Sequence, residues 1–294
     1  MHFQSQGRQQ KIMIIDGKAV ADSIKSELKK EIANLKAEDI IPGLAVIMVG
    51  NNPASHIYVG KKEKICEEIG IHSEKFLLPE DVPQSELENL IEKLNNKPSI
   101  NGILVQLPLP KHISEFAINA KILLEKDVDV FSPINIGKMM LGQNKLLPCT
   151  PAGILEMLKY YGISVSGKNC VVIGRSNIVG KPIATLLTQN DGTVTLCHSK
   201  TKNLKDYCKN ADLIICSVGK PKFLTSDMVK KGAVIIDVGI NRDENNKLCG
   251  DADFENLKDK ASYITPVPGG VGPMTIVMLA KNTVLATKIQ NKLL

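Results

Sequence analysis

The sequence predicts an α/β protein of two domains, and three observations lead to this fold class. The chain has 294 residues, which at roughly 150 residues per domain suggests about two domains. Helix-type and strand-type hydrophobic patterns alternate along almost the whole chain, as in proteins with parallel sheets. A proline-containing irregular segment, 131–151, interrupts the alternation. We therefore predict domains at 12–150 and 151–273, with a C-terminal helix in 274–294 that packs back on the first domain.

The first domain is predicted to be a β-α-β-α-β series preceded by a helix. Apolar residues at helical spacing predict the helices, and short apolar runs between turns predict the strands. The strand 44–49 (LAVIMV), for example, is entered through Pro42-Gly43 and left through Gly50-Asn51-Asn52-Pro53. The predicted helices are 20–35, 54–69 and 85–94, and the predicted strands are 44–49, 75–78 and 103–106.

The second domain continues the alternation with strands rich in β-branched residues. Its predicted helices are 152–161 and 180–189, and its predicted strands are 169–173, 193–197, 213–217 and 233–238. This pattern is typical of a doubly wound sheet, in which ligands bind at the carboxyl ends of the strands. The last predicted helix, 274–292, follows a glycine-rich loop.

Composition excludes several classes of protein. The 43% hydrophobic and 23% charged residues are ordinary for a soluble globular protein, and the net charge of +6 comes from scattered lysines, which argues against nucleic-acid binding. The seven cysteines form no C-x-x-C pair and the five histidines show no metal-ligand spacing, so we expect no metal and a cytoplasmic location. No apolar stretch is long enough to span a membrane. The start, MHFQSQGRQQ, lacks the apolar centre of a signal peptide and is left out of the predicted fold.

The stretch VVIGRSNIVGKP, Val171 to Pro182, predicts an anion-binding loop. It joins a strand to a helix N-terminus, where free N–H groups attract phosphate. The usual G-x-G-x-x-G is absent, because Ser176 and Val179 stand at the second and third glycine positions after Gly174. Ser176 can still donate its hydroxyl hydrogen to a phosphate.

The end of the next strand favours NADP over NAD. An NAD site places Asp or Glu there to hold the ribose 2′-OH, whereas this chain has His198-Ser199-Lys200. Together with Arg175 in the loop, these residues suit a 2′-phosphate. The alternative is a tight strand-to-helix turn with a surface arginine.

A second group of polar residues lies in the first domain. Ser55, Tyr58 and Lys62 are spaced to share one face of a predicted helix. A lysine beside a phenol in a cleft can have a depressed pKa and transfer protons near neutral pH. The alternative for this motif is an exposed polar face with a packed tyrosine.

Three further motifs lie where ligands are expected. Gln106 ends a predicted parallel strand, where a polar side chain points into the ligand crevice. Asp127 and Asp129 form a polar pair in KDVDVF, which could equally be a helix-ending turn. The segment TPVPGGVGPMT, 265–275, has exposed backbone that could approach a flat ligand, or it is simply a well-structured turn.

Taken in order, SxxYVxxK, VQLPLP, KDVD, GRSxxVGxP, CHSKT and PGGVGPMT resemble one family, from about Ile14 to the C-terminus. This is the bifunctional methylenetetrahydrofolate dehydrogenase/methenyltetrahydrofolate cyclohydrolase family. The resemblance implies an active-site cleft between an N-terminal α/β catalytic domain and a Rossmann-like NADP-binding domain. It implies oxidation of 5,10-methylenetetrahydrofolate by NADP, followed by hydrolysis of the 5,10-methenyl product to 10-formyltetrahydrofolate. It further implies a homodimer active in cytoplasmic one-carbon metabolism, tetrahydrofolate interconversion and purine biosynthesis.

The resemblance also implies roles for individual residues. In the hydrolytic step Lys62 would be the general acid/base, Gln106 would hydrogen-bond and orient it, and Tyr58 and Asp129 would complete the catalytic group. Substrate would be held by Ser55, Tyr58, Asp129 and the loop Pro268, Gly269 and Gly270. Gly174, Arg175, Ser176, Ser199 and Ile240 would hold the cofactor, with Arg175 and Ser199 at the 2′-phosphate and Ile240 at the nicotinamide.

The sequence departs from the family pattern at one position. A glycine is expected after the second aspartate (DVDG), but this chain has Val130. Valine takes a positive φ only at a cost. Of the site residues, Asp129 is therefore the one whose position we expect to differ from the family pattern, and with it the affinity for substrate.

A family member with only one of the two activities is one alternative, although Lys62 and Arg175 favour both activities. Three other classes of protein also compete with this interpretation. A short-chain dehydrogenase also uses Y-x-x-x-K, but there the glycine loop comes first, whereas here Tyr58 precedes Gly174. A shikimate-dehydrogenase-like NADP oxidoreductase has a similar domain order but does not explain VQLPLP or PGGVGPMT. A catalytically silent nucleotide-binding regulator would not need the proton shuttle that Tyr58, Lys62 and Gln106 suggest.

Overall fold

The computed structural model describes residues 12–294, apart from the side chain of Ala54. The MHFQSQGRQQ segment lies outside the described residues. The chain forms two compact units, and each is described by itself. Of the described residues, one unit contains 12–17 together with Tyr161–Val271, and the other contains Lys18–Tyr160 together with Gly272–Leu294.

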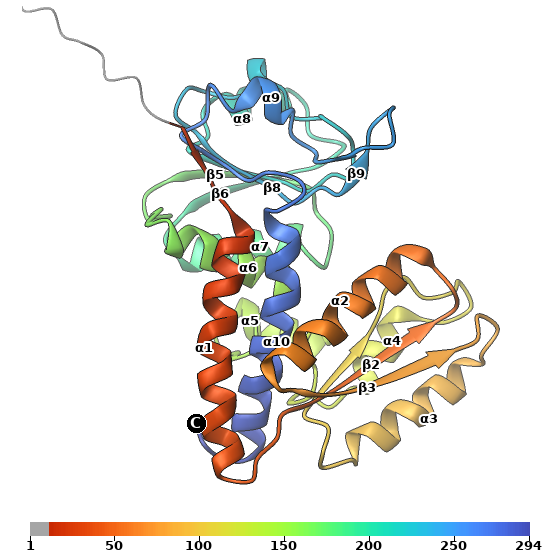
Figure 1. Cartoon of the computed structure of the whole chain (residues 1–294). Helices are drawn as coiled ribbons and strands as arrows, with labels where there is room; N and C mark the ends of the chain where they lie inside the picture. The colour runs from red at the N-terminus through yellow and green to blue at the C-terminus, as the bar shows by residue number, and fades with distance from the viewer. Residues whose placement is uncertain (1–11) are drawn as a thin grey trace, which may run out of the picture. The chain divides into compact units, whose positions relative to one another are not determined.

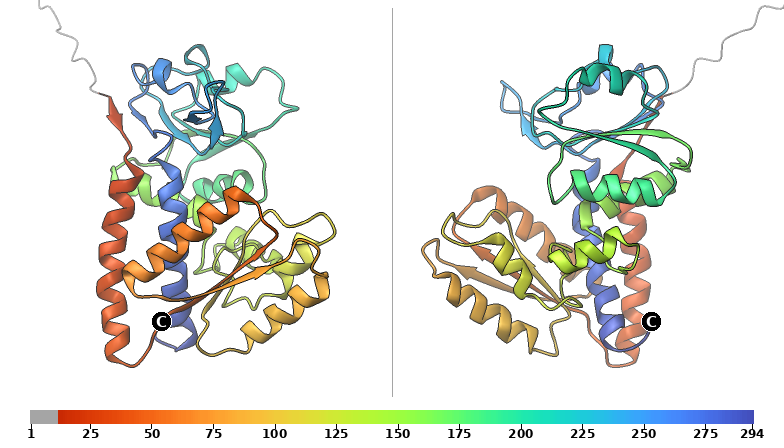
Figure 2. Two further views of the ribbon diagram at one scale, coloured as in Figure 1. Left: turned by 45° about the vertical axis from the view of Figure 1, so that its right-hand side comes forward. Right: turned by 180° about the vertical axis from the view of Figure 1, so that it is seen from behind.

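The unit of Lys18–Tyr160 and Gly272–Leu294 is built on a three-stranded parallel sheet (Figure 1). Its order is β3-β2-β4, with β2 (Gly43–Val49) in the centre between β3 (His72–Leu78) and β4 (Gly102–Val105). Every residue of β2 is buried, as a central strand covered on both faces requires. Helices α2 (Pro53–Ile69) and α3 (Gln84–Asn95) lie on opposite sides of the sheet (Figures 1 and 2).

The other helices of this unit are α1 (Gly17–Ala37), α4 (Glu115–Lys121), α5 (Pro133–Met140), α6 (Cys149–Tyr160) and α10 (Val271–Gln290). Helices α1 and α10 run side by side (Figure 2) and are joined by an ion pair between Lys288 and Glu31 at 2.6 Å. Helix α6 lies in this unit, whereas the division at 150/151 left it with the second domain. The prediction of an irregular segment holds for 141–148 but is wrong for 133–140, because Pro133 occupies the first turn of α5, where a proline is well tolerated.

The other unit contains a six-stranded sheet of order β1-β11-β8-β7-β5-β6, in which all pairs are parallel. The strands are β1 (Met13–Ile14), β5 (Asn169–Ile173), β6 (Thr193–Cys197), β7 (Leu213–Cys216), β8 (Val234–Asp237) and β11 (Tyr263–Ile264). Helix α7 (Gly180–Gln189) lies on one face, and α8 (Leu204–Lys209) and α9 (Phe254–Leu257) on the other (Figure 2). A short helix, η1 (Ser226–Met228), and a hairpin of β9 (Asn241–Arg242) and β10 (Leu248–Cys249) complete the unit.

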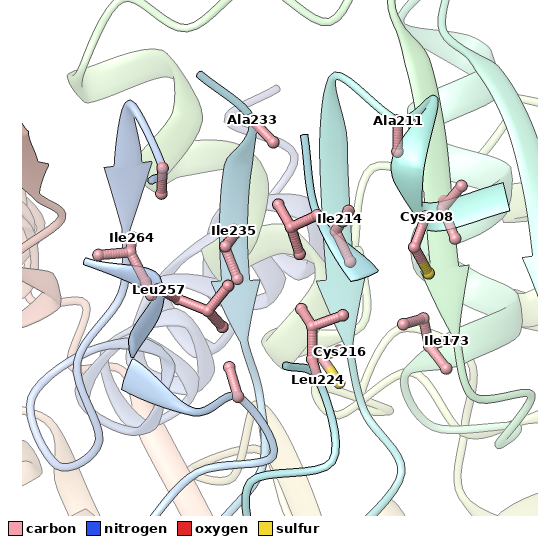
Figure 3. Packing of buried hydrophobic residues seen from close by; sticks show 14 of the residues in the cluster. Ile173, Cys208, Ala211, Ile214, Cys216, Leu224, Ala233, Ile235, Leu257 and Ile264 are labelled. Carbon is pink, nitrogen blue, oxygen red and sulfur yellow. The ribbon is translucent and has the colours of Figure 1, made fainter. Parts of the chain in front are cut away.

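The core of this sheet is made by aligned apolar residues of neighbouring strands. Ile214, Ile235 and Ile264 pair across β7, β8 and β11, and Figure 3 shows them side by side. Cys208 and Cys216 are fully buried in the same cluster. All seven cysteines are free thiols in the structure, and six of them are buried.

Candidate active site

Two lysines, Lys62 and Lys126, are buried in the unit of Lys18–Tyr160 and Gly272–Leu294, and Lys126 Nζ donates to three backbone carbonyls. Helix α2 turns Ser55, Val59 and Lys62 inward, and only 7% of the Lys62 surface is exposed. Burial lowers the pKa of Lys62, and the nearby Asp129 carboxylate opposes that effect. The alternative of an exposed polar face is therefore wrong for Ser55 and Lys62.

Gln106 holds this amine in place. Lys62 Nζ donates a hydrogen bond to Gln106 Oε1 at 2.9 Å. Gln106 follows β4 directly and is fixed by two bonds of its own, from its N–H to the Ile47 carbonyl and from Nε2 to the Leu107 carbonyl, both at 2.8 Å. Because Nε2 is committed to a carbonyl, Oε1 is the atom presented to Lys62.

Asp129 and Cys149 complete the surroundings of Lys62. Burial raises the pKa of the Asp129 carboxyl, while the charge of Lys62 acts in the opposite direction. Cys149, at the start of α6, is buried and donates its thiol to the Val128 carbonyl at 3.4 Å. Burial and the Asp129 charge raise the pKa of Cys149, so it is a neutral thiol. Sequence reasoning missed Cys149, since a single cysteine in PCTP carries no spacing that would connect it to Lys62.

Asp127 shapes the turn that carries Asp129. Its carboxylate accepts hydrogen bonds from the N–H groups of Phe131 and Ser132 at 3.1 and 3.0 Å, and from Asn135 Nδ2 at 2.9 Å. Asp127 is itself buried, at the junction between β4 and α5. The alternative interpretation, a helix-ending turn, is wrong for Asp127, because α4 ends at Lys121 and Asp127 pairs with Ile103 in an isolated β-bridge.

Val130 lies in the same turn and adopts the conformation that was expected to favour glycine. Its φ is +60°, and its side chain is fully buried. For a β-branched residue this left-handed conformation is strained, typically by about 1–2 kcal/mol. The side chain is packed inside the protein, and the residue takes the left-handed conformation all the same.

We expect Val130→Gly to destabilise the protein despite relieving this strain. Losing a buried valine costs about 1.5–3 kcal/mol, and glycine adds about 0.4–1 kcal/mol of unfolded-state entropy. These costs exceed the relief, so the free energy of unfolding should fall by about 1 kcal/mol. Urea denaturation of the two proteins measures the difference, and a more stable Val130→Gly variant would contradict this estimate.

Tyr58 lies on α2 one turn before Lys62. Its ring is half-buried, burial raises the pKa of its hydroxyl, and Lys61 Nζ lies 5.9 Å from the ring centroid. Ser55, one turn further back, is buried, and its N–H donates to Asn52 Oδ1 at 3.1 Å. Tyr58 thus keeps an accessible aromatic face in the unit that holds Lys62, Gln106 and Asp129.

The loop after β5 has the backbone of a phosphate-binding turn. Gly174 has a φ of +123°, and a Cβ there would lie 2.0 Å from the Ser217 carbonyl oxygen. A Cβ on Gly180 would lie 2.1 Å from the Gly174 carbonyl oxygen. Both glycines are therefore required by close backbone approach, although the standard three-glycine motif is absent.

Ser176 replaces the second glycine and caps α7. Its hydroxyl oxygen accepts hydrogen bonds from the N–H groups of Val179 and Gly180, both at 3.2 Å. The hydroxyl hydrogen remains to donate to an anion. The Ser176 hydroxyl, at the start of α7, therefore fits a phosphate group of a dinucleotide.

Arg175, Ser199 and Ile240 are exposed at the carboxyl ends of β5, β6 and β8. Ile240 is 51% exposed, which is high for a large apolar side chain that follows a buried strand. The segment 198–200 after β6 contains no carboxylate. A cationic and hydroxyl-bearing edge of this kind fits a 2′-phosphate.

The loop 265–270 precedes α10 and is tightly packed. Gly269 has a φ of +107°, and a Cβ on Gly17 would lie 1.9 Å from the Gly270 carbonyl oxygen. Pro268 is exposed, whereas Gly270 is buried.

Within residues 12–294, no group of three or more His, Cys, Asp or Glu side chains could hold a metal ion. Over the same residues, no helix is long and apolar enough to cross a membrane.

Family models match both parts of the chain. Residues 15–129 match the catalytic domain of tetrahydrofolate dehydrogenase/cyclohydrolase, and residues 148–291 match its NAD(P)-binding domain. The chain is 56% identical over 280 residues to "Bifunctional protein FolD" of Acetivibrio thermocellus, covering 95% of this chain and 98% of that protein.

Solved structures give the same result. The chain is 52% identical to the bifunctional enzyme FolD of Campylobacter jejuni, with a TM-score of 0.94 and coverage of 95% and 99%. It is 38% identical to Trypanosoma brucei FolD complexed with NADP cofactor and inhibitor, with a TM-score of 0.91 and coverage of 96% and 99%. A shikimate 5-dehydrogenase of Thermus thermophilus is only 16% identical, with a TM-score of 0.55, and shares the fold alone.

Proposed function

Since this chain belongs to the tetrahydrofolate dehydrogenase/cyclohydrolase family, we propose that its two reactions depend on one buried lysine and one dinucleotide loop. The chain is an NADP-dependent methylenetetrahydrofolate dehydrogenase and a methenyltetrahydrofolate cyclohydrolase. It oxidises 5,10-methylenetetrahydrofolate and hydrolyses the 5,10-methenyl product to 10-formyltetrahydrofolate.

The buried Lys62 amine, held 2.9 Å from Gln106 Oε1, is the observation that carries the hydrolytic mechanism. The methenyl carbon is an amidinium cation, so water attacks it without prior activation of the carbon. Neutral Lys62 accepts a proton from this water, and the resulting ammonium protonates N5 as the N5–carbon bond breaks. The carbon remains on N10, and the hydroxyl of the tetrahedral intermediate loses its proton to solvent as the C=O bond of the formyl group forms. The lowered pKa of Lys62 increases the fraction of neutral amine that begins this sequence.

The folate is held by groups around Lys62. Tyr58 stacks on a substrate ring, with Ser55 at the base of the same helix face. Asp129 accepts hydrogen bonds from the pterin amino group and ring N–H, and its electrostatic contact with Lys62 places that ring near the amine. Backbone groups of Pro268, Gly269 and Gly270 contribute further contacts.

The dehydrogenase reaction depends on positioning. When bound, NADP would supply the hydride acceptor for the methylene carbon, and the protein's part in this transfer would be alignment rather than acid or base catalysis. Gly174 and Ser176, before α7, would hold the pyrophosphate, and Ile240 would line the nicotinamide pocket. Arg175 and Ser199 hold the 2′-phosphate, supported by their exposure at neighbouring strand ends.

We expect Arg175→Ala to raise the KM for NADP by about 10- to 100-fold, because it removes a charged hydrogen bond to the 2′-phosphate. The KM for NAD should stay the same. Dinucleotide reduction by 5,10-methylenetetrahydrofolate, followed spectrophotometrically with each cofactor, measures both constants. Arg242→Ala is the matched control, since Arg242 bonds the Asn246 carbonyl within its own hairpin. Equal losses with NADP and NAD would contradict the role of Arg175, and no reduction with either would contradict the proposed function.

We also propose that the enzyme is a homodimer in the cytoplasm and that its product supplies purine biosynthesis. The seven unpaired thiols support a reducing compartment, and the family resemblance supports the dimer and the pathway. Sedimentation equilibrium of the purified chain distinguishes a dimer from a monomer.

A further inference from the structure

Asp251 is a fully buried carboxylate that the mechanism above does not use. Its exposed fraction is 0%. It accepts hydrogen bonds from three consecutive backbone N–H groups, those of Val218, Gly219 and Lys220, on the loop after β7. It also accepts one from Asn241 Nδ2 at 2.8 Å, just after β8. The Asp251 side chain thus connects the loop 218–220 with Asn241, two segments that are distant in sequence.

A second buried carboxylate fixes Asp251 itself. Asp237 accepts hydrogen bonds from the N–H groups of Asp251 and Ala252 at 2.9 and 2.8 Å, and from that of Gly239 at 2.9 Å. A Cβ on Gly250 would lie 1.8 Å from Asp237 Oδ2, so the chain passes directly against this carboxylate. Burial raises the pKa of Asp237 to about 6, which leaves it ionised at neutral pH.

The two loops held by Asp251 border the expected cofactor crevice. Strand β5 lies between β6 and β7 in the sheet, so the strand order changes direction at β5. In doubly wound sheets the ligand lies outside the carboxyl ends of the strands at such a point. Ile173 and Cys216, labelled in Figure 3, are the last paired residues of β5 and β7. Ser217 follows β7 directly, and its carbonyl oxygen lies so near Gly174 that a Cβ there would be 2.0 Å from it.

We propose that Asp251 is a positioning residue for NADP, which fixes the loop 217–220 to the segment around Asn241 and so sets the shape of the crevice beside Gly174. This inference rests on the cofactor site assigned above. Asp251 acts through the loops and does not itself touch the dinucleotide. The three N–H groups at 218–220 all donate to this carboxylate, so Asp251 fixes the path of the loop.

The test is Asp251→Asn, which keeps the size of the side chain. One carboxylate oxygen serves Val218 and Gly219, and the other serves Lys220 and Asn241. Whichever way the amide is turned, its NH₂ group therefore faces two donors, and the loops must move. We expect the KM for NADP to rise by about tenfold or more, since small displacements of positioning groups have effects of this order. The dehydrogenase kcat at saturating NADP should change by less than about threefold.

Two measurements separate positioning from general structural damage. Hydrolysis of 5,10-methenyltetrahydrofolate without cofactor should keep its kcat and KM. A dehydrogenase kcat close to wild type at saturating NADP shows that the unit containing Tyr161–Val271 is folded in the variant. The control variant is Asp212→Asn, because Asp212 also pins a backbone N–H, that of Asn169 at 2.8 Å, but at the opposite ends of β5 and β7. Its KM for NADP should match the wild type.

Asn241→Ala removes the hydrogen bond from Asn241 Nδ2 to Asp251. It tests the positioning role of Asp251 if Asp251→Asn does not fold. It should raise the KM for NADP less than Asp251→Asn, and the double variant should be less impaired than the product of the two single effects. An unchanged KM for NADP in folded Asp251→Asn, or in Asn241→Ala where only that variant folds, overturns the inference. An equal rise in Asp212→Asn also overturns it. Loss of NADP reduction in the wild type would instead contradict the proposed function.

Discussion

Replacing Lys62 with methionine should abolish the cyclohydrolase reaction while making the protein more stable. The hydrolytic rate should fall by at least about 100-fold, because methionine cannot accept or return the proton. Methionine has a similar length and no charge, so it fills the same buried space without the desolvation cost that lowers the pKa of Lys62. We expect the free energy of unfolding at pH 7 to rise by about 1 kcal/mol. Loss of the methenyl chromophore and urea denaturation measure the two effects.

The stabilisation should depend on pH in a defined direction. The pKa of Lys62 is lower in the folded protein than the 10.5 of the unfolded chain, so folding disfavours the protonated amine. This penalty is fully present below the folded-state pKa and disappears as the pH approaches 10.5. The advantage of Lys62→Met over wild type should therefore be largest near neutral pH and shrink in alkaline buffer.

Lys64→Met is the matched control, because Lys64 is an exposed lysine on the same helix. The Lys64→Met variant should have the cyclohydrolase rate and the free energy of unfolding of the wild type. If Lys62→Met still hydrolyses the substrate at the wild-type rate, Lys62 is not the acid/base. If it is less stable than wild type, the interactions with Gln106 and Asp129 outweigh the cost of burial.

Sequence patterns located the regular elements well where the signal is local. The strands at 169–173 and 193–197 and the helix at 180–189 agree with β5, β6 and α7 to the residue. Each is a hydrophobic run or an amphipathic segment bounded by glycine, proline or polar residues, so its ends are marked in the chain itself. Strands β1 and β11, of two residues each, were missed, because only their pairing with each other and with β8 defines them.

The candidate site shows the same limit. The pairing of Lys62 with Gln106 followed from the family resemblance, and the hydrogen bond is present. The buried state of Lys62 did not follow from local pattern, since Y-x-x-x-K also fits a solvated helix face. Asp251 was missed because its partners are backbone N–H groups and one amide from other loops, and GDAD has no spacing that would reveal them. Side chains that act through backbone groups of distant loops leave little trace in a single sequence.

Gly174→Ala should remove the dehydrogenase activity and leave the cyclohydrolase reaction in place. Alanine would have to adopt a φ of +123° and place its Cβ 2.0 Å from the Ser217 carbonyl oxygen, so the loop after β5 must move away from β7. We expect kcat/KM for NADP to fall by at least about 100-fold and the free energy of unfolding to fall by about 2–4 kcal/mol. Hydrolysis of the methenyl substrate without cofactor should persist, because Lys62, Gln106 and Asp129 belong to the other compact unit.

Gly167→Ala separates the two causes of this effect. Gly167 also has a positive φ, of +71°, but a Cβ there meets no atom within 4 Å. It should cost only the conformational strain, about 1 kcal/mol, and leave the KM for NADP unchanged. The difference between the two variants then measures the close approach of Ser217 to Gly174. If Gly174→Ala bound NADP as tightly as Gly167→Ala does, contact between the loops after β5 and β7 would not be required for the cofactor site.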